Sequence, residues 1–387
     1  MTNEHFIGID IGTQSIKLVV AEPNSNNQLP KIIYLAESPA HGFRHGYIVD
    51  QEQATESLHT LLQKAEKEFK QKITKARFSI GGIGLSSQYV RTSIEGTKRV
   101  NEISSRDVED VLQKSEDLFT AKYPNKKILH IIPVKYRVDS KDVLGTPIGM
   151  YGNTLEIKVI FITILEHHYD AFVSVIEKNN ISITDIIASP IADAAGSTTY
   201  KQKTQGCMVA NIGAETTSVA TFENGIITSL DTLPIGSNDI TNDIALGLQI
   251  PLDIADDIKK GINKDYPKRK VDEIIHARIA DILELADKHL KKIKKNRLLP
   301  AGIIFTGGGS HIENLNEYAK QELRLPSEGF HLTRTSKKSK RTIQVPNQYS
   351  IAYGLCISES GHQHFSVGFS FKKVRQTLDY WINQIMP

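Results

Sequence analysis

The sequence predicts an α/β protein with two lobes, each built around a β-sheet of the same design. Residues 6–20 (FIGIDIGTQSIKLVV) and residues 207–219 (CMVANIGAETTSV) repeat one pattern about 200 residues apart. Each segment has an apolar strand, a short turn with a glycine and a second apolar strand, which predicts a β-hairpin. A third segment, residues 302–310 (GIIFTGGGS), is a strand that runs into glycines. An internal repeat on this scale indicates a duplicated fold.

The two predicted turns have the chemistry of a phosphate site. Backbone N–H groups that gather in such a turn bind anions, and glycine lets a ligand approach because it has no Cβ. Asp10 ends the first strand, where a carboxylate can hold the water shell of Mg²⁺. Two such hairpins and a glycine-rich turn therefore predict a nucleotide cleft between two lobes.

Composition describes an ordinary globular protein. The 387 residues are 40% hydrophobic and 24% charged, enough for two domains with their own cores. The net charge of +3 is too small to indicate nucleic-acid binding. Cys207 and Cys356 are expected to be free thiols. The start, MTNEH, lacks the pattern of a signal peptide, and the aliphatic run at 159–165 is too short to span a membrane.

The first lobe is expected to continue after its hairpin with a strand near 31–37 and a helix at about 51–70. Residues 78–163 change in character and predict a compact α+β insertion. Its expected elements are a strand from Arg77, a helix that opens at residues 104–107 with Ser105 in a loose capping pattern, and strands at 126–139 and 154–165. A helix near 167–179 and a strand near 182–188 return to the first lobe.

The second lobe is expected from Thr204 onward. After its hairpin, apolar residues recur at helical spacing between 238 and 299, which predicts helices that pack one face on a core. The glycine-rich segment should lead into a helix at 311–323. Residues 324–345 are expected to form a loop and an edge strand, and a helix at 350–358 closes the first lobe.

The C-terminal residues form a separate pattern. Residues 359–369 have few apolar side chains and suggest a linker, whereas residues 370–387 predict an amphipathic helix. At about 100° per residue its apolar side chains fall within an arc of roughly 100°, and basic residues gather at its N-terminal end. Such a helix lies in a membrane interface; the alternative is a helix docked on the core. The residues concerned are Phe371, Lys372, Lys373, Val374, Arg375, Leu378, Trp381, Ile382 and Ile385.

These motifs resemble the actin-like ATPases and, within them, the FtsA family of bacterial cell division. Residues 7–13 and 209–217 resemble the two phosphate motifs, and residues 304–309 resemble the adenosine motif. The stretches 41–50, 129–133 and 233–245 resemble FtsA rather than sugar kinases or DnaK-type chaperones. The resemblance implies an actin-like two-lobed fold with duplicated β-sheet cores flanked by helices, an α+β insertion subdomain and a C-terminal amphipathic helix.

The resemblance also implies a division of the chain. Lobe one would comprise residues 1–77, 164–203 and the closing helix 350–358, with residues 78–163 inserted. Lobe two would comprise residues 204–237 and 300–349, with the helical subdomain 238–299. A linker (359–369) and the membrane-targeting helix (370–387) would follow.

The cofactors implied are ATP and Mg²⁺. Asp10, and Asn211 through a water molecule, would lie by the metal. The implied nucleotide contacts are Asp10, Gly12, Thr13, Gln14, Lys17, Gly213, Ala214, Glu215, Thr216, Asp256, Lys259, Gly307, Gly308 and Gly309.

Three positions depart from the family pattern. Asn211 stands where the second motif usually has Asp, and a neutral side chain forms weaker hydrogen bonds than a charged one. Glu215 brings a carboxylate near the phosphates, where it repels them unless it points away or replaces the missing Asp. Ser189 stands where hydrolytic relatives have a Glu or Gln that orients water. We therefore expect ATP binding with slow or absent hydrolysis and assign no catalytic residue. Asn211→Asp should raise turnover if the missing charge limits it.

The function implied is that of an adaptor that polymerises on the inner face of the cytoplasmic membrane at the division site and tethers FtsZ. Its partners would be the FtsZ C-terminal tail, further copies of itself in filaments, the anionic membrane surface and other division proteins. Candidates for tail binding are Arg278, Lys288, Lys291 and Lys292. One alternative is a PilM-like cytoplasmic component of a type IV pilus machine, which the departure at Glu215 slightly favours. The other is a soluble sugar or acyl kinase.

Overall fold

The computed structural model describes residues 5–24, 29–95, 101–330, 332–335 and 342–359. They divide into two compact units, of which the first contains the described residues up to 83 and from 170 to 359. The second unit contains residues 84–169. The predicted amphipathic helix, and the predicted linker from residue 360 on, lie outside the described residues.

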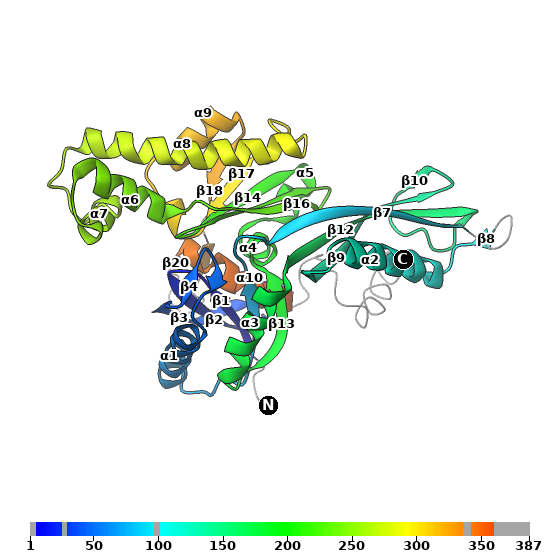
Figure 1. Cartoon of the computed structure of the whole chain (residues 1–387), viewed down its shortest axis with the longest axis horizontal. Coiled ribbons are helices and arrows are strands. Elements are labelled where there is room, and N and C mark those ends of the chain that lie inside the picture. Colours follow the sequence, from blue (N-terminus) through cyan, green and yellow to red (C-terminus); the bar gives the residue numbers. More distant parts are fainter. Residues whose placement is uncertain (1–4, 25–28, 96–100, 331, 336–341, 360–387) are drawn as a thin grey trace. The chain divides into compact units, whose positions relative to one another are not determined.

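The first unit contains two five-stranded sheets (Figure 1). The strands of the first sheet are β1 (Phe6–Ile11), β2 (Ser15–Glu22), β3 (Lys31–Pro39), β6 (Lys75–Ile80) and β13 (Ser182–Ala188), in the order β13-β6-β1-β2-β3. The strands of the second sheet are β14 (Cys207–Ile212), β15 (Thr217–Glu223), β16 (Ile226–Leu233), β17 (Ile303–Thr306) and β18 (Ser327–Gly329), in the order β16-β15-β14-β17-β18.

The two sheets repeat one topology. In each, the first three strands along the chain form an antiparallel meander, and two later strands add in parallel beside the first. Strand β14 therefore corresponds to β1, and β17 corresponds to β6. The predicted duplication is confirmed, and the structure adds that corresponding strands have corresponding neighbours in the two sheets.

Two helices pack closely together in this unit and contact both sheets. They are α4 (Ser189–Ser197), which contacts β14, β15 and β17, and α10 (Ser350–Glu359), which contacts β1 and β2. Glycines allow the close approach, because a Cβ on Gly354 would lie 1.7 Å from the carbonyl oxygen of Ala192. On the outer side of the first sheet, α1 (Gln51–Phe69) packs against β2 and β3 and is capped by Asp50.

The helical part of the second lobe comprises α6 (Ser237–Leu248), α7 (Leu252–Lys259) and α8 (Lys268–Lys292). Ile244, Ile258, Ile279 and Leu283 share one buried cluster, as the helical spacing predicts. The helix after the glycines, α9 (Leu315–Leu323), begins later than predicted, because residues Gly308–His311 first form a 3₁₀ turn.

The remaining elements of the first unit are short. They are the hairpin β4 (Phe43–Arg44) and β5 (Tyr47–Ile48), α5 (Tyr200–Gln205), the hairpin β19 (Leu332–Thr335) and β20 (Thr342–Val345), and the 3₁₀ turn Asn347–Tyr349. Helix α3 (Glu166–Lys178) runs across the boundary between the units.

The second unit is a four-stranded sheet with one long helix. Its strands are β7 (Ser86–Glu95), β9 (Lys126–Val138), β10 (Lys141–Val143) and β12 (Thr154–Leu165), in the order β10-β9-β12-β7, with β8 (Asn101–Glu102) and β11 (Tyr151–Gly152) paired separately. Helix α2 (Ser105–Lys122) packs on the sheet through Phe119. The Phe119 ring stacks on the Phe161 ring, and the two ring centroids are 4.6 Å apart. Ser104, rather than Ser105, caps this helix together with Asp107.

The structure shifts the start of the insertion. The expected boundary at 78 falls inside β6, which pairs with β1 and β13 in the first sheet, and the second unit begins at residue 84. An apolar strand fits either neighbour, and only its pairing decides to which sheet it belongs. Within the described ranges, no helix combines the length and the apolar character needed to cross a membrane.

Candidate functional site

The two duplicated turns have the same internal geometry. The N–H of Gly12 donates to the carbonyl of Ser15 at 3.2 Å, and the N–H of Gly213 donates to the carbonyl of Thr216 at 2.9 Å. A Cβ added to Gly12 would lie 2.9 Å from the carbonyl oxygen of Ser15, and one added to Gly213 would lie 2.9 Å from that of Thr216. Both glycines are therefore required by the turns themselves, before any ligand is considered.

Asp10 is fixed by the strand beside it. It lies opposite Ser79 in the β1–β6 pair, and the Ser79 hydroxyl donates to its Oδ1 at 2.6 Å. Burial raises the pKa of Asp10, while Lys17 and the hydrogen bond from Ser79 lower it. Lys17 itself donates to Ser15 at 2.7 Å and lies 3.8 Å from Glu37. Ser79 occupies one carboxylate oxygen, so the donor set fits a metal that keeps most of its water ligands.

Asn211 occupies the corresponding place in the second lobe. It lies opposite Thr306 in the β14–β17 pair, and its Nδ2 donates to Thr306 Oγ1 at 3.1 Å. The same Nδ2 donates to Oδ2 of Asp193 at 3.2 Å, and the Thr306 hydroxyl also donates to this oxygen. Asp193 is fully buried, and this burial raises its pKa to about 6, although nearby Ser350 and the hydrogen bonds from Thr306 and Asn211 act to lower it.

Asp193 was not among the predicted site residues. It lies in α4, whose sequence SPIADAAGS has no other charged residue. A lone carboxylate in a helix of small and apolar residues is costly to bury without partners. That local signal was available, but the partners were not visible from the sequence.

The three glycines after β17 have different roles. Gly307 has a φ of +81°, and a Cβ there would lie 2.7 Å from Oδ1 of Asn211. A Cβ on Gly309 would lie 2.4 Å from the side chain of Ile212. A Cβ on Gly308 would have no neighbouring atom within 4 Å. Packing on the second hairpin thus explains Gly307 and Gly309, whereas Gly308 has open space.

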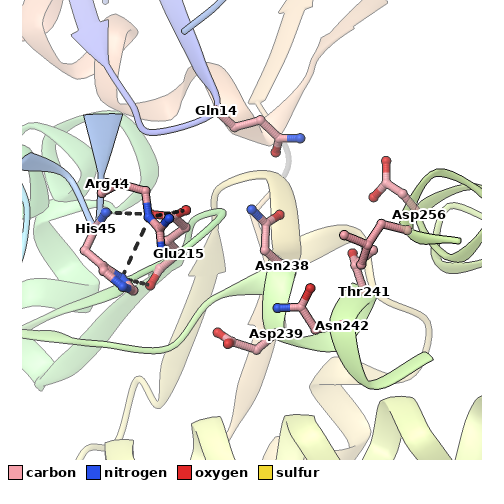
Figure 2. A pocket seen from close by; sticks show the side chains of 10 residues that line it. Gln14, Arg44, His45, Glu215, Asn238, Asp239, Thr241, Asn242 and Asp256 are labelled. Carbon is pink, nitrogen blue, oxygen red and sulfur yellow. Dashed lines mark hydrogen bonds and ion pairs between the residues drawn. The ribbon is translucent and has the colours of Figure 1, made fainter. Parts of the chain in front are cut away.

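A pocket of about 450 Å³ lies beside these turns, and Figure 2 shows its lining. The first lobe contributes Gln14, Arg44 and His45, and the second contributes Glu215, Asn238, Asp239, Thr241, Asn242, Leu252 and Asp256. Of the predicted contacts, Gln14, Glu215 and Asp256 line the pocket directly. Arg44, His45 and the residues of α6 were missed as site residues, although they lie in the stretches that resemble the family most specifically.

Glu215 connects the second turn to the first lobe. Its carboxylate accepts the backbone N–H of His45 at 2.5 Å and lies 3.5 Å from Nε of Arg44 (Figure 2). The next N–H, that of Gly46, donates to Oγ1 of Thr13 in the first turn at 3.0 Å. The β4–β5 turn therefore contacts both duplicated turns, and the side chain of Glu215 points to this turn.

Asp256 and Lys259 on α7 differ in what they contact. Lys259 donates to Thr241 at 2.6 Å and to the carbonyl of Ser237 at 3.2 Å, which ties α7 to α6. It also lies 2.9 Å from Asp256, whose side chain faces the pocket. The second turn is tied to α6 as well, because Gly213 and Ala214 accept the N–H groups of Ser237 and Asn238 at 2.8 Å.

Ser189 is the first residue of α4, as expected from the sequence, and it is nearly buried beside Gly81. Over the part of the chain that the structure describes, no group of three or more His, Cys, Asp or Glu side chains is arranged to hold a metal ion. A divalent cation at this site would therefore need phosphate and water oxygens among its ligands, as Mg²⁺ commonly does.

The predicted basic residues of α8 all have acidic neighbours. Arg278 forms two hydrogen bonds to Asp243 on α6, at 2.6 and 2.9 Å. Lys288 pairs with Glu284, Lys291 with Asp287, and Lys292 lies 4.0 Å from Asp231. A second pocket, of about 480 Å³, was not predicted and is lined by Lys268, Arg269, Asp272, Glu273, His276 and Tyr318.

Comparison with known proteins identifies the family. The family model "Cell division protein FtsA" matches residues 208–354, and the model "SHS2 domain inserted in FTSA" matches residues 82–163. Cell division protein FtsA of Bacillus subtilis (strain 168) is 27% identical in an alignment of 350 positions that covers 83% of this chain and 77% of that protein. Its counterpart in Borreliella burgdorferi is 24% identical in an alignment of 391 positions, gaps included, that covers 95% of this chain and 93% of that protein.

Solved structures show the same fold. The PilM–PilN type IV pilus biogenesis complex matches with a TM-score of 0.66 at 16% identity, over 92% of this chain and 99% of that one. MreB5 of Spiroplasma citri bound to ADP matches with a TM-score of 0.55 at 13% identity, over 97% of this chain and 98% of that one. At these identities the likeness is one of fold, and it makes the two-lobed architecture actin-like. With both FtsA models matched in their expected places and full-length relatives aligned, this chain belongs to the FtsA family of cell-division proteins.

Proposed function

We propose that this chain binds ATP with Mg²⁺ between its two lobes and polymerises on the inner face of the cytoplasmic membrane, where it tethers FtsZ filaments at the division site. The observation that carries the nucleotide part is the matched pair of turns, with Asp10 beside Ser79 and Asn211 beside Thr306. The pocket next to these turns is lined from both lobes. MreB5 structures of the same fold contain ADP or AMPPNP.

Each part of the site has a defined task in this proposal. The backbone N–H groups of the two glycine turns bind the phosphates, and Lys17 adds charge from the first hairpin. Asp10 would hold water ligands of a Mg²⁺ ion, which would supply positive charge next to the phosphate oxygens. Gly308 has the open space that an approaching adenosine needs. The pocket's carboxylates Glu215, Asp239 and Asp256 outnumber Arg44, so binding of the anionic nucleotide depends on its cation.

Hydrolysis is expected to be slow. The residue that begins α4 after the last strand of the first sheet is Ser189, and a hydroxyl is a poor base for activating water. Nucleotide then acts as a ligand that favours the closed arrangement of the lobes.

Titration with ATP, in Mg²⁺ and in EDTA, tests the nucleotide part. We expect saturable binding that is stronger with Mg²⁺, and we expect Asp10→Asn to lose most of this gain from Mg²⁺. Absence of saturable binding to the full chain would contradict it.

The FtsZ tail is proposed to bind the helical subdomain of α6–α8. Reversing the charge of basic residues can distinguish two surfaces of this subdomain. One double variant, Lys291→Glu with Lys292→Glu, changes the end of α8, and the other, Lys268→Glu with Arg269→Glu, changes the second pocket. We expect the Lys291 and Lys292 pair to abolish binding of a fluorescent FtsZ-tail peptide and the Lys268 and Arg269 pair to serve as the matched control. If neither pair weakens binding, the tail does not bind to α8.

Membrane attachment is proposed for residues 370–387 on the sequence pattern alone. Deletion of residues 369–387 is expected to leave a folded chain that no longer pellets with anionic liposomes, and Trp381→Glu is expected to act similarly. Lys372→Glu with Lys373→Glu should weaken binding in a salt-sensitive manner, because a basic residue near an anionic surface contributes about 1 kcal/mol. A truncated chain that pellets normally would exclude this role. The likeness to PilM is one of fold, so a chain that binds neither liposomes nor the tail would favour the pilus alternative.

A further inference from the structure

The duplication leaves one mismatch at the centre of the site. In the first lobe, Asp10 and Ser79 lie opposite each other in the β1–β6 pair and share a hydrogen bond. In the second lobe the same places in the β14–β17 pair are taken by Asn211 and Thr306. The hydroxyl is retained in both lobes, whereas the carboxylate is missing from β14.

A carboxylate nevertheless reaches this pair from another element. Oδ2 of Asp193 accepts from Asn211 Nδ2 at 3.2 Å and from the Thr306 hydroxyl. Asp193 lies on α4, 18 residues before Asn211 in the chain and 113 before Thr306. Asp193 is 0% exposed, so water does not replace these partners.

We propose that Asp193 is the carboxylate of the second half-site, carried by α4 instead of β14, and that it is a positioning residue that fixes the amide of Asn211. An ionised carboxylate only accepts hydrogen bonds. The Thr306 proton is directed to Asp193, so Thr306 must accept from Asn211. Asp193 and Thr306 therefore both accept a hydrogen bond from Nδ2 of Asn211. The other atom of this amide, Oδ1, lies beside Gly307 and is left as a hydrogen-bond acceptor.

This arrangement names a ligand class for Asn211. An oxygen held in this orientation accepts from water bound to a divalent cation, which the proposed nucleotide site requires; this step rests on the proposed function. Partners behind a ligand of this kind commonly change metal affinity by 10–100-fold when they are removed.

The geometry also corrects an expectation from the sequence. Asn211→Asp alone would place two carboxylates about 3 Å apart in a buried site, where like charges disfavour each other's ionisation. We therefore expect this substitution to destabilise the protein rather than simply to restore turnover. Exchanging the two side chains, Asp193→Asn with Asn211→Asp, keeps one carboxylate and one amide in contact.

The experiment compares both single variants, the exchange variant and a control, Asp231→Asn, on β16. The first measurement is the Tm of the full chain without nucleotide or metal at pH 8. We expect Asn211→Asp to lower the Tm by about 5–10 °C and the exchange to recover more than half of that loss. If the effects of the single variants simply add in the exchange variant, Asp193 and Asn211 do not act as a pair and the proposal is wrong.

The second measurement is the ratio of ATP affinities with and without Mg²⁺. We expect Asp193→Asn to reduce this ratio about tenfold or more and Asp231→Asn to leave it unchanged. A lower Tm with an unchanged ratio would make Asp193 a packing residue only. If the wild-type chain binds no ATP, the proposed function fails, whereas the Tm of the exchange variant still decides whether the two residues form one unit.

Discussion

Glu215 in the second turn corresponds to Gln14 in the first, and both side chains line the same pocket (Figure 2). The carboxylate of Glu215 is held by the backbone N–H of His45 at 2.5 Å, with Arg44 at 3.5 Å. One substitution in a duplicated turn thus creates a contact between the lobes. It also adds negative charge to a pocket that is proposed to bind an anion.

Glu215→Gln is expected to strengthen binding of ATP in the absence of Mg²⁺ by roughly 3- to 10-fold, because it removes one repulsive charge. Gln14→Glu adds a charge at the corresponding place and should weaken binding to a similar extent. Both effects should shrink when Mg²⁺ is present. Fluorescence titration measures them, and equal affinities for all three chains would refute the electrostatic argument.

Lys203 is a charged residue in an apolar place. It lies on α5, 2% exposed, with its ammonium group 5.9 Å from the centre of the Phe222 ring. Burial lowers the pKa of Lys203 to about 7, and burial also raises the pKa of the neighbouring Cys207 thiol to about 12. The unfolded chain keeps the lysine protonated up to about pH 10. Between pH 7 and 10 the unfolded state therefore binds more protons than the folded state.

The stability of the wild-type chain should consequently rise with pH through this window, at up to about 1.4 kcal/mol per pH unit from this residue. Lys203→Met should raise the Tm most at pH 7 and progressively less towards pH 9. Lys201→Met, at an exposed position on the same helix, is the matched control and should show no such trend. A pH-independent difference between Lys203→Met and the wild type would mean that the lysine stays charged in the fold.

At the scale of elements, α4 and α10 cross closely at two glycines. A Cβ on Gly196 of α4 would lie 2.1 Å from the carbonyl oxygen of Ser350, and one on Gly354 of α10 would lie 1.7 Å from that of Ala192. These distances leave no room for a methyl group. Asp193 lies on α4 at this crossing and is hydrogen-bonded to Asn211 on β14 and Thr306 on β17.

Gly354→Ala should therefore destabilise the protein by about 1–3 kcal/mol, although alanine favours a helix. The added methyl would lie 1.7 Å from the Ala192 carbonyl, so the helices must separate. Gly308→Ala, with open space around the added atom, should keep the Tm and instead weaken ATP binding. Thermal unfolding and ATP titration of both variants separate the two roles. A stable Gly354→Ala protein would show that the crossing can relax.

For the whole molecule, two sheets of one topology present equivalent turns to a pocket lined from both lobes. A ligand that contacts both turns binds only the folded chain and therefore stabilises it. At a ligand concentration of 100 times Kd the gain is about 2.7 kcal/mol. The gain should depend on residues from both lobes.

We expect Mg²⁺ with ATP to raise the Tm of the wild-type chain by several degrees. Asp10→Asn in the first lobe and Gly308→Val in the second should each reduce the shift, which differential scanning calorimetry would measure. A full shift in either variant would mean that the nucleotide binds one lobe only.

The sequence by itself determined the duplicated hairpins, the α+β character of the insertion and the helical subdomain. Each of these depends on local patterns, such as strand–glycine–strand turns and apolar residues at helical spacing. Gly12 and Gly213 were recognisable because a short-range turn requires them. The family followed from stretches such as 41–50 and 233–245, which also contain most of the missed pocket residues.

Only the tertiary structure decided the contacts between distant segments. Strand β6 could have joined the insertion by composition, but its pairing with β1 and β13 assigns it to the first sheet. The bond from His45 to Glu215 joins residues 170 apart, and that from Thr306 to Asp193 joins residues 113 apart. Such contacts depend on how the elements pack in three dimensions, and a local pattern carries no information about that packing.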